Sequence, residues 1–251
     1  MTGVPVIVPA GGTIDGSYSE AAGTKIRCLA PIGNSCVLQR VVTVLRATTA
    51  ISTIVVAAPD EVHQKVDGVD FWALSGSLGT DSIRNALKCL EGTERVLICT
   101  SDLPFLTPEA VADFIERSDP TADISIGLVK ARDYNQTFPD SPASTFVSLK
   151  ETGPITIGCL FFLTKAGQNR VDPWLDRLFN ARKSLLQSAL LLGPIVVGQL
   201  ITRRLSIKSL QHRAKQLIGL NVDIVLDVSP QLAFDIDTLE DYEYARTHII
   251  D

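Results

Sequence analysis

The stretch VPVIVPAGG, residues 4–12, decides the fold. Its first five residues are valine, isoleucine and proline, a composition that predicts a buried β-strand from Val4 to Val8. The strand then gives way to the pair Gly11-Gly12, which carries no side chains. Glycine lets a backbone approach a ligand closely, and a row of exposed N–H groups favours an anion such as phosphate. A tight turn accounts for the glycine pair equally well, so the rest of the chain must decide between the two.

Three more apolar runs have the composition of buried strands, and amphipathic helical patterns separate them. The runs are ISTIVVAAP (51–59), ERVLICTSD (94–102) and ADISIGLV (122–129), and the helical patterns are SCVLQRVVTVLRAT (35–48), DSIRNALKCL (81–90) and TPEAVADFIER (107–117). Apolar strands that alternate with helices predict a parallel sheet covered on both faces. The polar segment 11–25 is expected to be a loop. These patterns predict a single α/β domain.

The second half of the chain has a different pattern. Short strands are expected at TFVSL (145–149) and TIGCLFFL (156–163), then helices from Ala166 to about Leu217, then the strand VDIVLDV (222–228). The apolar stretch 184–204 approaches the length of a membrane span, but Gly193-Pro194 interrupts it. We therefore expect short buried helices or an oligomer interface there, which allows a homodimer, and no membrane span.

Composition excludes several classes of function. The 251 residues carry a formal net charge of −5, so the chain lacks the basic balance of a nucleic-acid-binding protein. Five cysteines without a CxxC pair predict reduced thiols and a cytoplasmic location. The glycine pair is followed by no GK[ST] and forms no GxGxxG, so ATPase and dehydrogenase interpretations lose their main support.

Aspartates follow two of the apolar segments. Asp102 comes directly after a predicted strand, and Thr107 already supplies the N-cap of the next helix, so capping does not explain it. In FDIDTLED, Asp235 and Asp237 alternate and would point to one side of an extended segment, although Asp237 or Thr238 could also cap the last helix. Carboxylates and phosphate oxygens are typical ligands of Mg²⁺. The sequence therefore predicts a magnesium site on these aspartates.

Taken together, these features resemble the MobA-like nucleotidyltransferases, which have a GT-A-type fold. The stretches that carry the resemblance are VPAGG (8–12), RCLAPIGNSCVLQRVV (27–42), LICTSDLPFLTPEAV (97–111) and FDIDTLEDY (234–242). The resemblance implies one three-layer α/β/α domain over residues 1–251, with a mostly parallel, Rossmann-like sheet. Residues 1–130 would form the nucleotide-binding part, 131–222 the acceptor or oligomerisation part, and 223–251 the closing strand and helix.

The resemblance also implies a set of site residues. Asp102 would hold Mg²⁺ together with Asp237, with Asp235 nearby. The family's catalytic lysine falls on Arg27, and Lys25, two residues earlier, is the other candidate for this role. The nucleotide would contact Ala10, Gly11, Gly12, Thr13, Gly76, Gly79, Ser82 and Ser101. The family's usual arginine after the glycine pair is missing, because Gly16 stands there, and the loop that follows is longer than usual.

The activity implied is transfer of a nucleoside monophosphate from an NTP, with GTP or CTP expected, to a phosphorylated small-molecule acceptor, with release of pyrophosphate. Two alternatives remain open. A GT-A glycosyltransferase would share the fold, but its usual DxD is replaced here by Ser101-Asp102-Leu103. A non-catalytic nucleotide-binding homologue would fit the changed glycine loop, while the retained Asp102 and Asp237 count against it.

Overall fold

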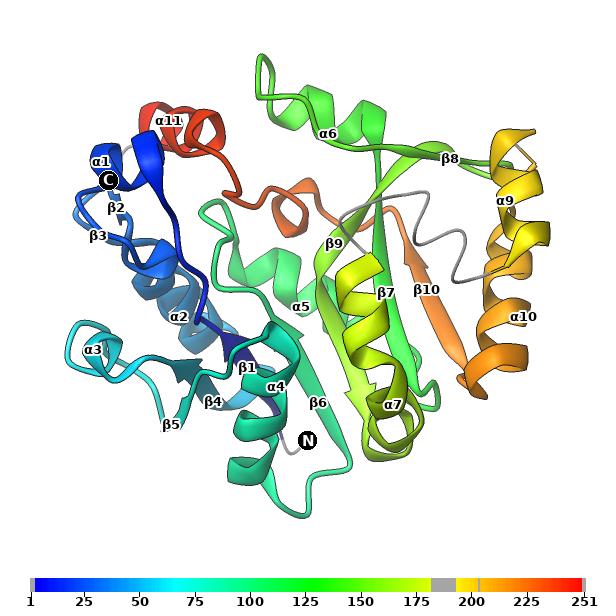
Figure 1. The fold of residues 1–251 in the computed structure, drawn as a ribbon, viewed down its shortest axis with the longest axis horizontal. Helices are drawn as coiled ribbons and strands as arrows, with labels where there is room; N and C mark the ends of the chain where they lie inside the picture. Colours follow the sequence, from blue (N-terminus) through cyan, green and yellow to red (C-terminus); the bar gives the residue numbers. More distant parts are fainter. Residues whose placement is uncertain (1–2, 182–192, 203, 250–251) are drawn as a thin grey trace.

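The computed structural model describes residues 3–181, 193–202 and 204–249 (Figure 1). The strands are β1 (Val4–Pro9), β2 (Pro31–Ile32), β3 (Ser35–Cys36), β4 (Ile51–Ala58), β5 (Phe71–Leu74), β6 (Arg95–Cys99), β7 (Ile124–Lys130), β8 (Val147–Leu149), β9 (Gly153–Thr164) and β10 (Val222–Leu226). The α-helices are α1 (Gly16–Ala22), α2 (Val37–Ala47), α3 (Asp60–His63), α4 (Gly79–Leu87), α5 (Pro108–Arg117), α6 (Ala131–Thr137), α7 (Lys165–Ala181), α9 (Pro194–Ile201), α10 (Ile207–Ile218) and α11 (Leu239–His248). Single 3₁₀ turns are η1 (Arg27–Leu29), η2 (Lys88–Leu90) and η3 (Pro230–Leu232).

The main sheet has the strand order β10-β7-β9-β6-β1-β4-β5, with β8 paired to β9. Strand β1 runs parallel to β4 and β6, β4 runs parallel to β5, and β10 runs parallel to β7. Strand β9 is reversed, because it pairs antiparallel with both β6 and β7. The expected mostly parallel sheet is confirmed. The carboxyl ends of β1, β4, β5 and β6 therefore meet at one edge, which is where open α/β sheets bind ligands.

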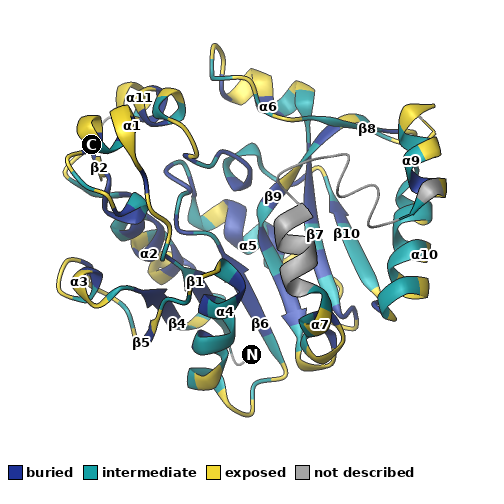
Figure 2. Cartoon of the chain, in the orientation of Figure 1, coloured by how far each residue is buried: buried dark blue, intermediate teal, exposed yellow. Residues whose placement is uncertain are grey.

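Helices cover both faces of this sheet, which confirms the three-layer arrangement. Val6 and Val8 of β1 pack in one core cluster with buried residues of α2, α5 and α11. Ile7, between them, packs in the opposite cluster with residues of α4 and α7. The alternation follows from the pleat of the strand, which turns successive side chains to opposite faces. Buried residues accordingly concentrate in the strands and on the inner sides of the helices (Figure 2).

The structure contains elements that the sequence-based expectation did not include, among them α3, α6, β2 and β3. The segment 11–25 is not all loop, because it contains helix α1, whose Tyr18 and Ala22 are buried. The ring of Tyr18 packs 5.2 Å from that of Tyr242 on α11, and this contact supports a helix too short to show a periodic pattern. The four-residue strand β5 was also not expected.

The apolar stretch 184–204 falls partly outside the described residues, which exclude 182–192 and 203. Within the described part, α9 begins at Pro194, directly after Gly193 with its φ of +100°. No described helix has the length and apolar character needed to cross a membrane.

Candidate active site

Asp102 lies in the loop between β6 and α5, three residues beyond the last residue of the strand. Leu103 and Leu106 on either side of the turn are buried and anchor this loop in the core. The hydroxyl of Thr107 accepts a hydrogen bond from the N–H of Ala110 at 3.2 Å, as expected of the helix N-cap. The carboxylate of Asp102 is thus not needed for capping and is 16% exposed.

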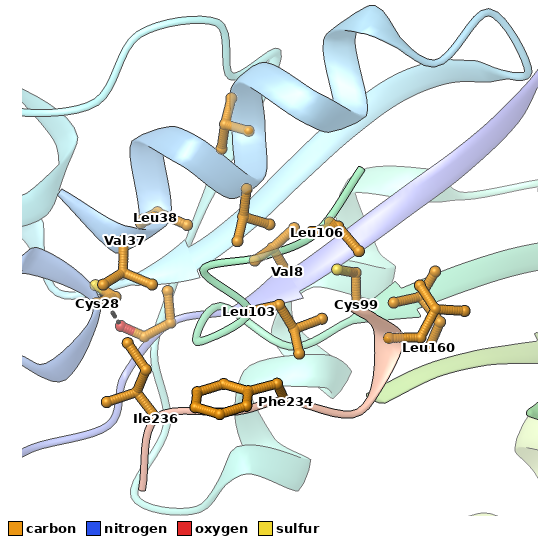
Figure 3. Close-up of a cluster of buried hydrophobic side chains, with 14 of the residues drawn as sticks. Val8, Cys28, Val37, Leu38, Cys99, Leu103, Leu106, Leu160, Phe234 and Ile236 are labelled. Atoms are coloured by element: carbon orange, nitrogen blue, oxygen red, sulfur yellow. Dashed lines mark hydrogen bonds between the residues drawn. The ribbon is translucent and has the colours of Figure 1, made fainter. Parts of the chain in front are cut away.

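A second segment crosses this loop and brings two more carboxylates. The N–H of Ile236 donates to the carbonyl oxygen of Asp102 at 3.0 Å. The side chains of Phe234 and Ile236 are buried in the same cluster as Leu103 (Figure 3). Asp235 and Asp237 alternate with these apolar anchors, and their carboxylates come together with that of Asp102. One carboxylate oxygen from each of the three lies within 4.8 Å of the others.

Arg27, the first residue of the 3₁₀ turn that follows α1, reaches the same cluster. Its backbone N–H donates to the carbonyl oxygen of Gly12 at 2.9 Å. The N–H of Ile14 donates to the carbonyl oxygen of Lys25 at 2.9 Å, so the two ends of the segment that contains α1 are tied together. The greater length of this segment therefore does not move Arg27 away from Gly12.

The cation that meets the carboxylates is Arg27 rather than Lys25. The Nη1 of Arg27 lies 3.5 Å from Oδ2 of Asp102 and also forms an ion pair with Asp237. The Lys25 side chain is exposed, and no ion pair joins it to these carboxylates in the described structure. Of the two candidates for the family's lysine, Arg27 is the one that the fold places at the site.

The carboxylate cluster is poorly compensated. Within the described residues, Arg27 is the cation paired with the three carboxylates, and it contacts Asp102 and Asp237, so the ionised cluster carries a formal excess of negative charge. Burial, then the charges of Asp102 and Asp237, raise the pKa of Asp235 to about 7. Burial also raises the pKa of Asp102, against the pull of Arg27. Burial opposes the charge of Arg27, yet Asp237 and Asp102 raise the pKa of this guanidinium.

These residues fit a hard divalent cation. Oδ1 of Asp102 is buried and has no hydrogen-bond partner among the described residues, and a buried polar atom of this kind is costly unless something binds it. Oxygen donors from one or two carboxylates, completed by substrate phosphates, are the usual surroundings of protein-bound Mg²⁺. Asp102, Asp235 and Asp237 are the group in the described part of the chain with this arrangement.

The predicted nucleotide-binding residues gather at the adjoining strand ends. A Cβ on Gly11 would lie 2.6 Å from Cβ of Ser75, directly after β5. The N–H of Gly76 donates to the hydroxyl of Ser82 at 3.0 Å, and Gly79 is the first residue of α4. The ends of β1 and β5 and the start of α4 thus form one surface.

Not every predicted contact residue presents its side chain. Ser82 is 2% exposed, and its hydroxyl donates to the carbonyl oxygen of Leu78, so the hydroxyl holds the loop. Ala10 and Ser101 are buried, whereas Gly12 and Thr13 are exposed, and Thr13 pairs with Ile26 in an isolated β-bridge. The individual roles of these residues stay predictions.

Sequence reasoning missed Tyr18. Its hydroxyl is buried and has no hydrogen-bond partner within the described ranges, although the ring is firmly packed on Tyr242. Burial raises the pKa of this phenol, while the charge of Arg27 lowers it. The only signal in the sequence was the spacing of Tyr18 and Ala22, one helical turn apart within a polar segment.

Comparison with protein families identifies the chain. A family model described as the MobA-like NTP transferase domain matches residues 6–148, more than half of the 251 residues. The chain belongs to this family. The nucleotidyltransferase class expected from the sequence is therefore confirmed, and the matched region contains Gly11, Arg27 and Asp102. The search of curated proteins found no match to this chain.

Solved structures share the fold along nearly the whole chain. A hypothetical transferase from Thermus thermophilus is 27% identical, with a TM-score of 0.82 over 95% of this chain and 99% of that one. CMP:2-keto-3-deoxy-manno-octonic acid synthetase in complex with CTP is 13% identical, with a TM-score of 0.62 over 98% of each chain. The 2-C-methyl-D-erythritol 4-phosphate cytidylyltransferase of Thermus thermophilus is 16% identical, with a TM-score of 0.53 over 98% of each chain.

The carboxylate cluster should lower the stability of the metal-free protein in a pH-dependent way. Because the pKa of Asp235 is about 7 in the folded chain, against 3.8 for an ordinary aspartate, the folded protein keeps a proton that the unfolded chain loses. Stability is therefore lost as pH rises from about 4 through about 7. Asp235→Asn removes this loss, so its Tm should equal that of the wild type near pH 4 and exceed it at pH 8.

Each 1 kcal/mol of unfolding free energy that the variant regains corresponds to a rise in Tm of about 2–4 °C in a chain of this size. Thermal unfolding in EDTA at pH 4, 6 and 8 measures the difference. A Tm difference that does not grow with pH would contradict this account of Asp235.

Proposed function

We propose that the protein is a Mg²⁺-dependent nucleotidyltransferase that moves a nucleoside monophosphate from an NTP to a phosphorylated small molecule and releases pyrophosphate. One observation carries the proposal: the carboxylates of Asp102, Asp235 and Asp237 lie within 4.8 Å of one another, next to Arg27 and the Gly11-Gly12 backbone. This arrangement combines a cation site with a backbone that a phosphate chain can approach.

Each group has a role in the proposed reaction. Asp102 and Asp237, with Asp235, would hold Mg²⁺, which when bound neutralises phosphate charge and supports in-line attack on the α-phosphorus. The backbone at Gly11 and Gly12 would lie along the nucleotide. Arg27 would donate hydrogen bonds to the departing pyrophosphate, whose negative charge grows as the bond breaks. Since the acceptor phosphate is itself the nucleophile, catalysis would rest on positioning and charge neutralisation.

Two kinds of observation support this proposal over its rivals. The glycosyltransferase alternative lacks its usual DxD, whereas the match to the MobA-like NTP transferase domain covers the glycine loop and Asp102. Solved structures of the same fold include one in complex with CTP and one named for a phosphorylated acceptor, 2-C-methyl-D-erythritol 4-phosphate. CTP and GTP are accordingly the first donors to test, and a phosphate monoester is the first class of acceptor. A cytoplasmic location and a homodimer stay part of the proposal.

Pyrophosphate release tests the proposal directly. Wild-type protein is incubated with Mg²⁺, one of the four NTPs and each of a panel of sugar, polyol and pterin phosphates. Release that requires both a particular NTP and a particular acceptor, and that stops in EDTA, is the expected result. The same samples are followed by thermal unfolding. Metal-dependent stabilisation by an NTP without turnover across the panel would favour the non-catalytic homologue, and no stabilisation by any NTP would overturn nucleotide binding altogether.

A further inference from the structure

Arg27 contacts the carboxylate cluster through only part of its guanidinium group. A single atom, Nη1, contacts both Asp102 and Asp237. A guanidinium can instead pair two nitrogens with the two oxygens of one carboxylate, which gives a stronger and more specific contact. Here Nε of Arg27 and Oδ1 of Asp102 are both buried, and neither has a hydrogen-bond partner in the part of the chain that the structure describes. This contact therefore leaves a hydrogen-bond donor of the guanidinium and a hydrogen-bond acceptor of the carboxylate cluster unused.

We propose that Arg27 is an exchangeable counter-ion: it holds the aspartates in the metal-free protein and leaves them for the nucleotide phosphates when a divalent cation enters. The inference rests on the proposed function, because it assigns the regulation of that same site. The cation would be held by the carboxylates of Asp102 and Asp237, the two groups that Arg27 now contacts. The positively charged guanidinium and the cation would compete for these carboxylates and repel each other, so both cannot be held equally well.

The structure allows the side chain to move while the backbone stays fixed. The N–H of Arg27 is tied to Gly12, and the 3₁₀ turn that begins at Arg27 carries the buried residues Cys28 and Leu29. The side chain of Arg27 is 26% exposed and that of Asp237 is 61% exposed, so the ion pair between them faces solvent. Gly12 has no side chain beside Arg27, whose Nε would lie 3.7 Å from a Cβ there. Rotation of the guanidinium toward the glycine loop therefore meets no side chain at position 12.

A consequence is that metal and nucleotide bind cooperatively, and that Arg27 is the residue that couples them. The cation releases Arg27 from the carboxylates, and the phosphates hold the released guanidinium, so each ligand removes a competitor of the other. Thermodynamic linkage requires the effect to be reciprocal. Without nucleotide, Arg27 should weaken metal binding, and without metal the carboxylates should keep Arg27 from the nucleotide.

Arg27→Met removes the charge and keeps an unbranched side chain of comparable reach. Titration with Mn²⁺ alone, followed by electron paramagnetic resonance, measures metal affinity without turnover, and thermal unfolding with Mg²⁺ alone provides a second readout. We expect Arg27→Met to bind Mn²⁺ about tenfold more tightly than the wild type. We also expect it to have a lower Tm in EDTA and a larger rise in Tm on adding Mg²⁺. In the wild type, CTP or GTP should tighten Mn²⁺ binding more than it does in the variant.

Two controls make the result specific. Arg27→Lys keeps the positive charge and should retain most of the competition. Arg46→Met removes a surface arginine that pairs with Asp70 at 2.6 Å and should leave Mn²⁺ affinity unchanged. Equal or weaker Mn²⁺ binding by Arg27→Met would overturn this inference, while metal-dependent pyrophosphate release by the wild type would leave the proposed function standing. No Mn²⁺ binding by the wild type with either nucleotide would overturn both.

Discussion

Asp102→Asn should slow nucleotidyl transfer by about 10³-fold or more while leaving the protein folded. Asparagine has nearly the same shape as aspartate, and the backbone bond from Ile236 to the carbonyl oxygen of residue 102 does not depend on the side chain. The substitution removes a negative charge from the centre of the proposed metal site and leaves Arg27 paired with Asp237 alone. Because burial already raises the pKa of Asp102, losing this charge should not lower stability.

The measurement is pyrophosphate release at saturating Mg²⁺ and NTP, with metal-dependent thermal stabilisation as a readout independent of turnover. Asp123→Asn is a matched control, because Asp123 is also buried but lies in a structural network. It pairs with Nη1 of Arg170 at 2.6 Å and accepts the N–H of Asn221 at 2.8 Å. That variant should lose stability and keep its response to metal. A rate for Asp102→Asn within about tenfold of the wild type would remove Asp102 from the proposed metal site.

Much of this site follows from local sequence. Strong apolar runs predict β1, β4 and β6, and parallel strands place their carboxyl ends at one edge. That argument alone puts Gly11 and Asp102 near each other. The alternation of Phe234, Asp235, Ile236 and Asp237 likewise states which side chains enter the core and which face away from it. These are short-range patterns, and the structure agrees with them.

What the sequence does not show depends on distant pairing. The bonds from Ile14 to Lys25 and from Arg27 to Gly12 close a loop whose contents have no repetitive pattern. Because the sequence does not show this closure, the sequence alone could not select Arg27 over Lys25 as the cation at the site. The direction of β9 has no local signature either, because it is set by the partners β6 and β7 on both sides. Strand β5 has four residues, too few for a period to be recognised.

Gly11→Ala should weaken nucleotide binding by at least about tenfold and lower stability by about 1–3 kcal/mol. Neither Gly11 nor Gly12 has a positive φ, so alanine is conformationally allowed at both and any effect must come from contacts. A Cβ on Gly11 would lie 2.6 Å from Cβ of Ser75, an atom fixed to the backbone, so the end of β1 or of β5 must shift. At Gly12 the nearest atom is Nε of Arg27 at 3.7 Å, an ordinary contact.

Comparing the two alanine variants therefore separates the effect of a steric clash from the effect of lost backbone flexibility. Gly12→Ala should retain the wild-type Tm within about 1 °C, and Gly11→Ala should not. Adding Ser75→Gly to Gly11→Ala removes the clashing carbon and should restore most of the lost NTP-dependent stabilisation, measured by thermal unfolding with CTP or GTP and Mg²⁺. Equal behaviour of the two alanine variants would mean that the glycine pair serves only as a turn. Rescue by Ser75→Gly would instead show that nucleotide binding depends on how closely the ends of β1 and β5 approach each other, a spacing that glycine at residue 11 permits beside Ser75.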